Sequence, residues 1–174
     1  LPVGLPLLIV TGDAQPLTPA GQFELSTRLL EIFAEAKSEI MFILAGLAAE
    51  VEDDSVHLVC SDEDTRDAFK ARGIEASNEA PEAGMIGMAG LLASMAPMHS
   101  LASACIVAET LGSTVDVITS QRIANWIEEY LGIPLAISVD TTEKTADRIR
   151  KEIAMDTSEL DSLFEKSEPS PEFY

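Results

Sequence analysis

Apolar residues occur along this chain in short runs that are separated by longer segments with helical spacing. The runs at residues 7–11, 40–45, 56–60 and 104–108 each have the length of a β-strand. The first run contains no charged position and ends at a Gly-Asp pair, which is typical of a strand that is buried on both faces and leaves the sheet at a tight turn. We therefore expect four strands, of which residues 7–11 form a buried one.

The segments between these runs carry signals for helix starts and ends. Thr18 followed by Pro19 is a typical N-cap and first-turn pair. Farther along, Thr119 or Ser120 can cap a helix that Gly132 ends. The expected helices cover residues 19–36, 62–72, a segment from about residue 91 or earlier to near Pro97, residues 120–131, 143–154 and 158–164.

The alternation of strands and helices predicts an α/β fold of three layers, in which helices flank a mostly parallel mixed sheet. We place one α/β domain at residues 1–155 and a C-terminal helix at residues 156–166. Residues 167–174 are rich in Ser, Pro and Glu, so we expect a flexible tail there.

The charge balance excludes one class of partner. The chain has 30 Asp and Glu against 11 Lys and Arg, a formal charge of -19. Binding to a phosphate backbone requires clustered basic residues, so we expect no nucleic acid partner. The cysteines, Cys60 and Cys105, form neither a paired metal motif nor a disulfide framework, which favours a reducing cytoplasm.

Residues 83–108 contain no charged side chain and are long enough to cross a bilayer. The segment also contains three glycines, a proline and a histidine, and no basic cluster flanks it. We therefore interpret it as a buried helix with its entry loop, and we expect no membrane partner. Residues 1–10 lack the basic region of a secretory signal.

The glycines of this segment form one candidate site. Gly84, Gly87 and Gly90 precede or begin the expected helix, where bare backbone amides can hold an anion. The spacing matches neither GxxxxGK[ST] nor GxGxxG. Anion binding and close packing of a helix through glycine are both open interpretations.

A second polar group, Glu109, Thr110 and Asp116, follows the expected strand at 104–108. Open α/β sheets bind ligands at this end of their strands, although the same residues can also cap the next helix. The acidic residues near Asp62 do not meet the EF-hand pattern, and we interpret them as helix caps. We expect no metal site, no cofactor and no catalytic nucleophile, since GxSxG is absent.

Two sets of apolar side chains are candidates for partner binding. Met85 and Met88 lie in the uncharged segment with two further methionines, and flexible thioethers suit either an adaptable surface or core filling. Phe173 and Tyr174 end the polar tail, which predicts a docking arm or a frayed terminus.

Three segments occur in order and at a spacing that is typical of one family. They are Gly12-Asp13-Ala14-Gln15-Pro16 with Gly21 to Glu24, then Gly84 to Leu92, then Glu109 to Gly112 with Asp116. Together they resemble the archaeal and actinobacterial proteasome assembly chaperone family, which is also catalogued as an uncharacterised ATP-grasp-like group. The likeness covers roughly residues 5–155, and it adds Gly12 and Gln15 to the candidate ligand or anion pocket.

The resemblance implies a fold similar to that of purine nucleoside phosphorylase, homo-oligomers, and binding to proteasome α subunits. Archaeal members can end in a hydrophobic residue, a tyrosine and one final residue, and Phe173 and Tyr174 resemble the first two positions. The family normally starts with another strand, a glycine-rich turn and a helix, which we expect to be missing before Leu1. The ATP-grasp label finds no support in the sequence, which shows neither a lysine placed for a nucleotide nor a set of metal carboxylates.

We therefore expect a non-enzymatic, homo-oligomeric cytoplasmic protein of this chaperone type. The alternatives are a nucleoside phosphorylase-like or hydrolase-like enzyme of small molecules, and a ligand-sensing module. Both would use the glycine loop and the polar group that contains Glu109 and Asp116.

Overall fold

The structure is a computed structural model of the 174-residue chain, and its centre is a three-stranded mixed sheet. It describes residues 6–12, 14–48, 55–79, 87–110, 116–135, 137, 140, 144, 145, 147 and 148. Strand β3 (Ala102–Thr110) pairs in parallel with β1 (Ile40–Ala48) and antiparallel with β2 (Val56–Cys60). Three of the four expected strands are thus confirmed, and β1 and β3 extend beyond their predicted ends.

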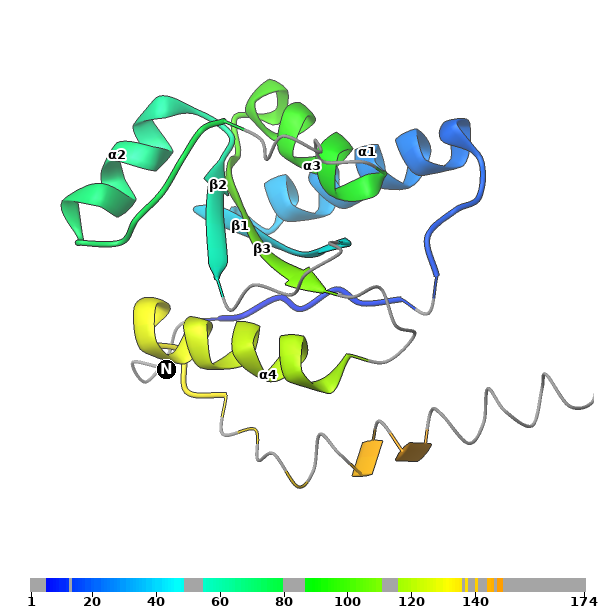
Figure 1. Cartoon of the computed structure of the whole chain (residues 1–174). Coiled ribbons are helices and arrows are strands. Elements are labelled where there is room, and N and C mark those ends of the chain that lie inside the picture. The colour runs from blue at the N-terminus through cyan, green and yellow to red at the C-terminus, as the bar shows by residue number, and fades with distance from the viewer. Residues whose placement is uncertain are drawn as a thin grey trace, which may run out of the picture.

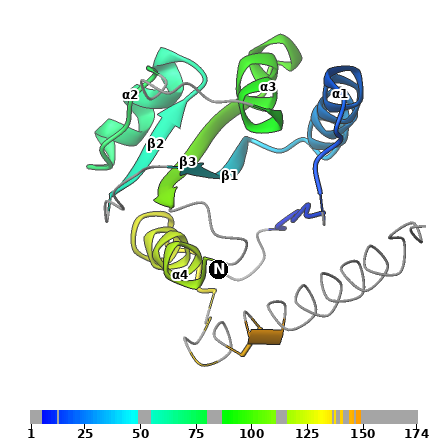
Figure 2. The ribbon, with the colours of Figure 1, turned by 45° about the vertical axis from the view of Figure 1, so that its right-hand side comes forward.

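Helices cover both faces of this sheet (Figure 1, Figure 2). Helices α1 (Pro19–Glu35) and α3 (Met88–Met95) pack against each other on one face. Helices α2 (Glu63–Ala71) and α4 (Val117–Trp126) lie on the other face, against β2 and β3. This arrangement confirms the expected α/β fold with a mixed sheet between helices.

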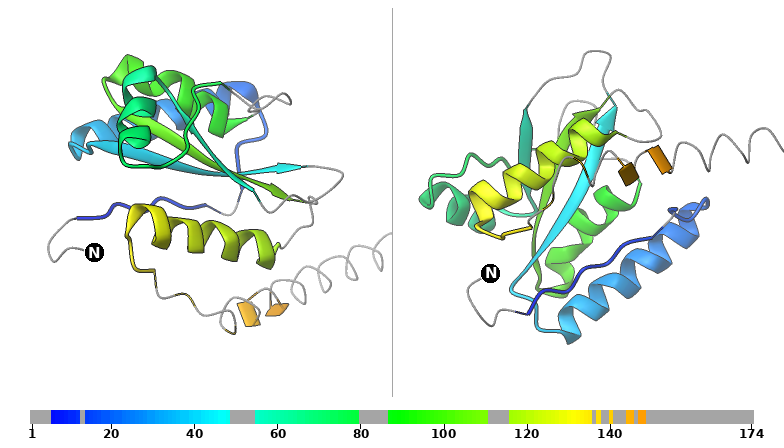
Figure 3. Two further views of the ribbon diagram at one scale, coloured as in Figure 1. Left: turned by 60° about the vertical axis from the view of Figure 1, so that its left-hand side comes forward. Right: turned by 90° about the horizontal axis from the view of Figure 1, so that it is seen from below.

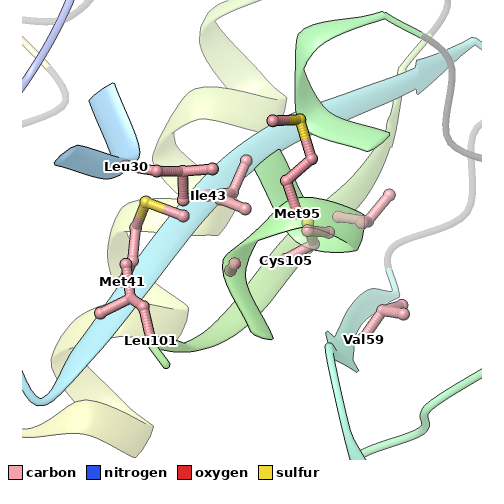
Figure 4. Close-up of a cluster of buried hydrophobic side chains, with 10 residues drawn as sticks. Leu30, Met41, Ile43, Val59, Met95, Leu101 and Cys105 are labelled. Atoms are coloured by element: carbon pink, nitrogen blue, oxygen red, sulfur yellow. The ribbon is translucent and has the colours of Figure 1, made fainter. Parts of the chain in front are cut away.

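Alternating side chains of β3 divide the core in two. Cys105 and Val107 point to the α1 and α3 face and join a buried cluster with Leu30, Ile43 and Met95. Figure 4 shows this cluster around the strands. Leu30 of α1 and Cys105 of β3 are fully buried in this cluster, so the helix and the sheet share one core.

The alternate side chains of β3 belong to a second buried cluster on the opposite face of the sheet. Ala104 and Ile106 are fully buried with Leu58 of β2 and Phe69 of α2. The ring of Phe69 contacts that of Phe42 edge to face, at a centroid separation of 6.1 Å. Helix α4 adds Ile123 to the rim of this cluster.

Most of the expected helix boundaries are confirmed. Thr18 caps α1, and its hydroxyl accepts a hydrogen bond from the backbone N–H of Gly21. A 3-10 turn, η1 (Ala96–His99), breaks the chain after α3 at Pro97, as the sequence predicts. Residues Ile127–Leu131 (η2) continue α4 as a π-type turn, and Gly132, with φ +66°, ends it in the left-handed conformation that favours glycine.

Two expectations are wrong in this structure. The cap of α4 is Asp116, and neither Thr119 nor Ser120 holds that position. Residues 7–11 are extended but belong to no strand of the described part of the chain, and Leu7 to Val10 keep 42–73% of their surface exposed. The physical reason is that a strand needs a hydrogen-bonded neighbour, and the described sheet pairs β3 with β1 and β2 without this run.

The predictions for the C-terminal part lie largely outside the described residues. These are the helices at residues 143–154 and 158–164, the C-terminal helix at residues 156–166 and the tail at residues 167–174. Within the described ranges, no helix combines the length and the apolar character that crossing a bilayer requires.

Candidate functional site

The candidate site lies where the parallel strands β1 and β3 both end. The N-termini of α3 and α4 point toward this edge of the sheet (Figure 1). The two strands approach closely there, because a Cβ atom added to Gly46 of β1 would lie 3.2 Å from Cγ2 of Thr110 on β3. Ligands of open α/β sheets bind in such positions, so the side chains at this edge are the natural candidates for chemistry.

Asp116 is the centre of the polar group at this edge. Its Oδ1 accepts the backbone N–H of Thr119 at 2.8 Å, which caps α4. Its Oδ2 accepts the hydroxyl of Thr119 at 2.8 Å and the hydroxyl of Thr110 at 2.5 Å. The carboxylate therefore connects the last residue of β3 to the first turn of α4.

These contacts decide the charge state of Asp116. Partial burial raises the pKa of its carboxyl, but hydrogen bonds from Thr110 and Thr119, together with the charge of Arg122, outweigh burial and leave the pKa below its ordinary value. Asp116 is therefore a carboxylate at neutral pH. Its oxygens are acceptors for the fold, and a general acid would need a pKa closer to the working pH.

Glu109 contributes through its backbone. Its carbonyl oxygen accepts the hydroxyl of Thr119 at 3.2 Å and a guanidinium N–H of Arg122 at 3.3 Å. The predicted group of Glu109, Thr110 and Asp116 is thus brought together, and Thr119 and Arg122 join it. What this arrangement does is hold α4 against the end of β3.

Gln15 makes a second connection at this edge. Its Oε1 accepts the backbone N–H of Met88, the first residue of α3, at 3.3 Å. Gly87 precedes this helix with φ +77° and ψ -152°, a region that is essentially restricted to glycine. A Cβ atom there would lie 3.0 Å from Oε1 of Gln15, so glycine is required by conformation and by space.

The remaining predicted site residues do not join either of these polar groups. Gly12 is exposed, Gly90 is half-buried in the first turn of α3, and Met88 is buried with 8% of its surface exposed. Gly84 and Met85 lie outside the described residues, as do Phe173 and Tyr174. The positive φ and the nearby Gln15 side chain account for Gly87, whereas packing of the helix on the sheet through glycine and anion binding both stay predictions.

Sequence reasoning missed Thr119 as a bonding partner, although a signal for it exists. Asp62 starts α2 in the same way: its Oδ1 accepts the N–H of Thr65 at 2.8 Å, and its Oδ2 accepts the Thr65 hydroxyl at 2.9 Å. Both helices therefore begin with Asp-x-x-Thr. This finding confirms the interpretation of the acidic residues near Asp62 as a cap.

The cysteines provide no activated nucleophile. Cys60 and Cys105 are buried free thiols, and burial is the main cause that raises the pKa of each to about 11. In the strand register Val59 lies opposite Cys105, so Cys60, one residue along, points to the other face of the sheet. Within the described ranges, no three His, Cys, Asp or Glu side chains gather as a metal site would require.

Comparison with known sequences gives two matches. A sequence model described as the PAC2 family matches residues 2–155. An uncharacterised protein of Methanocaldococcus jannaschii is 22% identical over 142 residues, which cover 81% of this chain and 54% of that protein. The chain thus spans about half the length of this curated relative.

Comparison with solved structures gives several similar folds. Pyrococcus furiosus PbaA, described as an archaeal homologue of proteasome-assembly chaperone, has a TM-score of 0.64 at 19% identity, over 86% of this chain and 66% of PbaA. Pyrococcus furiosus PbaB, described as an archaeal proteasome activator, has a TM-score of 0.62 at 20% identity, over 84% of this chain and 63% of PbaB. A Thermoplasma acidophilum protein of unknown function has a TM-score of 0.65 at 18% identity, over 89% of this chain and 62% of that protein. At these identities the likeness shows a shared fold.

Proposed function

The chain belongs to the PAC2 family, and from this premise we propose that it is a non-enzymatic protein of the proteasome assembly chaperone type that binds proteasome α subunits. The observation that carries the proposal is the family match over residues 2–155, joined to the fold that it shares with PbaA. The comparisons give no support to the ATP-grasp label. Homo-oligomer formation, a cytoplasmic location and a likeness to purine nucleoside phosphorylase are further parts of the proposal.

The polar groups at the carboxyl end of the sheet support binding over catalysis. Asp116 is held as a carboxylate by its own helix, and Gln15 caps α3. The two thiols are buried and have raised pKa values. Asp116 and Gln15 therefore have structural contacts that explain their positions without a reaction, and the thiols lack the lowered pKa of an activated nucleophile.

Exposed apolar side chains of the folded domain offer anchors for a protein partner. Leu17 is 98% exposed just before α1, and Met98 is 81% exposed in the turn η1. Ile118 in the first turn of α4 is 67% exposed. Met88 is buried, so within the described residues we assign the adaptable methionine contact to Met98 instead.

The charge of the chain sets how such a partner is approached. With a formal charge of -19, the protein attracts basic surfaces over distances that salt shortens. We propose that Phe173 and Tyr174 then add a second contact as a docking arm, which orders only on binding.

The test is a binding measurement with purified proteasome α subunits from the same organism, by biolayer interferometry at low and high salt. We expect binding whose association rate falls as salt rises. Removal of Phe173 and Tyr174 should weaken it if the arm contributes, and Leu17→Asp or Met98→Asp should weaken it if the domain contributes. Ser94→Asp, which adds the same charge to an exposed position of α3, is the matched control and should bind as the unaltered chain does.

Absence of binding by the unaltered chain at either salt would refute the proposal. The small-molecule alternative is then tested by thermal unfolding with phosphate, nucleosides or ATP, because a ligand of the native state raises the melting temperature. A shift with one of these ligands, together with no α-subunit binding, would favour the alternative.

A further inference from the structure

We infer that the end of α4 forms a surface that binds an arginine side chain of a protein partner, over the rings of Trp126 and Tyr130 and beside the carboxylate of Glu129. The inference deepens the proposed function and rests on it only for the identity of the partner. It follows from the aromatic pair, from the charges at this end of the helix and from the unusual turn in which they lie.

The end of α4 has an unusual geometry. After Val117–Trp126 the chain continues through Ile127–Leu131 as a π-type turn, and Gly132 then ends the helix with φ +66°. Turns of this type are rare and often occur at functional sites. In both views of Figure 3, α4 starts beside the carboxyl ends of β1 and β3 and runs back along the sheet, so its yellow C-terminal end lies away from the candidate site.

Two aromatic rings lie together at this end of the helix. The centroids of the Trp126 and Tyr130 rings are 5.1 Å apart, and their planes are inclined at 34°. Trp126 also packs against the buried cluster that contains Phe69, whereas Tyr130 keeps 41% of its surface exposed. The pair is therefore anchored to the core through Trp126 and presents an aromatic surface to solvent through Tyr130.

The charges beside these rings are the reverse of those that stabilise the end of a helix. A helix C-terminus carries partial negative charge, so basic residues stabilise it and acidic residues do not. Here Glu128 and Glu129 lie in the final turn, and no Lys, Arg or His occurs between residues 123 and 143. Such a departure from the rules of local stability is typical of residues that serve a function.

The two glutamates have different surroundings. A carboxylate oxygen of Glu128 accepts the backbone N–H of Leu135 at 2.7 Å, which holds the chain that follows Gly132. Glu129 is exposed and, among the residues that the structure describes, has no ion-pair partner. It lies three positions after Trp126, a spacing that makes side chains neighbours on a helix. The carboxylate of Glu129 is therefore available to a cation that lies over the rings.

An arginine side chain matches this combination of groups. A guanidinium stacks on aromatic rings, donates N–H groups to a carboxylate and is less strongly hydrated than an ammonium group. It also compensates the negative end of the helix. The formal charge of -19 attracts basic surfaces to the chain as a whole. An acidic or purely apolar occupant would gain nothing from Glu129 or from the helix end, so the surface favours a basic segment of a partner.

The test uses the fluorescence of Trp126, the single tryptophan of the chain. The probe is a blocked peptide, acetyl-Gly-Arg-Gly-Arg-Gly-amide, and the control peptide carries citrulline, which has a similar shape without the charge, in place of both arginines. We expect the arginine peptide to change the fluorescence in a saturable way that weakens as salt rises, and the citrulline peptide to cause no saturable change. Equal responses to the two peptides, or no saturable response to either, overturn the inference.

Matched variants locate the contact. Tyr130→Leu should weaken peptide binding about two- to fivefold, as expected for an exposed contact between a cation and a ring, whereas Tyr130→Phe keeps the ring and should bind as the unaltered chain does. Glu129→Gln should weaken binding about twofold, and Glu24→Gln, which removes the same charge from an exposed position of α1, should leave it unchanged. Unchanged affinity in Tyr130→Leu, or equal losses in the two glutamine variants, overturns the inference, because only diffuse attraction by the net charge would then remain.

The same variants separate this inference from the proposed function. A loss of proteasome α-subunit binding in Tyr130→Leu, by a factor similar to that for the peptide, supports the surface as part of that contact. Binding of the arginine peptide without binding of α subunits by the unaltered chain refutes the proposed function and leaves the arginine-binding surface in place. Binding of α subunits that Tyr130→Leu leaves unchanged overturns the inference and leaves the proposed function intact.

Discussion

Replacing Asp116 by alanine tests whether the polar group at the sheet edge is structural. The variant removes the carboxylate that accepts three hydrogen bonds from Thr110 and Thr119. It leaves the Thr119 hydroxyl with the carbonyl of Glu109, at 3.2 Å. The change therefore isolates the cap of α4 and its connection to β3.

The expected loss is worked from these bonds. Loss of an Asp N-cap costs about 1 kcal/mol. The bond from Thr110 to a charged acceptor adds about 1–2 kcal/mol, at the low end because the site is partly exposed. The free energy of unfolding should thus fall by about 2–3 kcal/mol, which for a chain of this size lowers the melting temperature by roughly 5–10 °C.

The assay is urea unfolding followed by circular dichroism, with two further variants. Asp116→Asn keeps an acceptor oxygen for the Thr119 amide, so it should lose about 1 kcal/mol or less. Asp67→Asn removes a carboxylate that is 64% exposed in its ion pair with Arg66, and it should lose about 0.5 kcal/mol or less.

The pH dependence has a definite sign. Because the pKa of Asp116 is lower in the folded state, its stabilisation is fully present above the ordinary Asp value of about 4 and is lost as pH falls through the lower folded value. The stability difference between the unaltered chain and Asp116→Asn should therefore shrink as pH falls from about 5 towards 3. A loss in Asp116→Ala no larger than that in Asp67→Asn, or a difference that grows on acidification, would refute the reasoning.

Three other predictions concern the core and the glycines. Gly87→Ala should lower the free energy of unfolding by about 2–4 kcal/mol and Gly73→Ala by about 1 kcal/mol, because both have positive φ but only Gly87 faces a close side chain. Equal losses in the urea midpoint would contradict this difference. Cys60 and Cys105, whose pKa values are raised to about 11, should react with a thiol reagent at pH 8 only after unfolding, and rapid labelling of the native chain would be evidence against their burial. Leu30→Ala, at a position with no exposed surface, should cost about 2–5 kcal/mol in the same unfolding assay, and a loss below about 1 kcal/mol would mean that the site collapses around the smaller side chain.

Local sequence signals are sufficient to predict most of the helices and strands. Thr18 and Pro19 mark the start of α1, and Gly132 marks the end of the α4 segment, because each acts on neighbouring backbone groups. For the cap of α4 the sequence offers both Asp116 and Thr119, and Asp116 holds the position for a physical reason. Thr119 is a good cap former, but the charged carboxylate of Asp116 accepts both its amide and its hydroxyl, which makes the stronger cap.

The contacts between distant segments could not be predicted from the sequence. Gln15 and Met88 are 73 positions apart, and nothing in either local pattern indicates that a side-chain amide will complete the start of α3. The run at residues 7–11 is the opposite case, because its local pattern is clear but its surroundings are not. An apolar run of this composition is buried only where a neighbouring surface covers it, and the sequence pattern does not show which surface that is.

These two cases meet at the same place in the molecule, since the exposed run at residues 7–11 leads through Gly12 to Gln15. The hydrogen bond from the N–H of Met88 to Gln15 connects this stretch to the start of α3, and a single net bond of this kind contributes only about 1 kcal/mol. Gln15→Ala, which removes the acceptor, should therefore speed hydrogen exchange at Met88 and lower the free energy of unfolding by no more than about 1 kcal/mol.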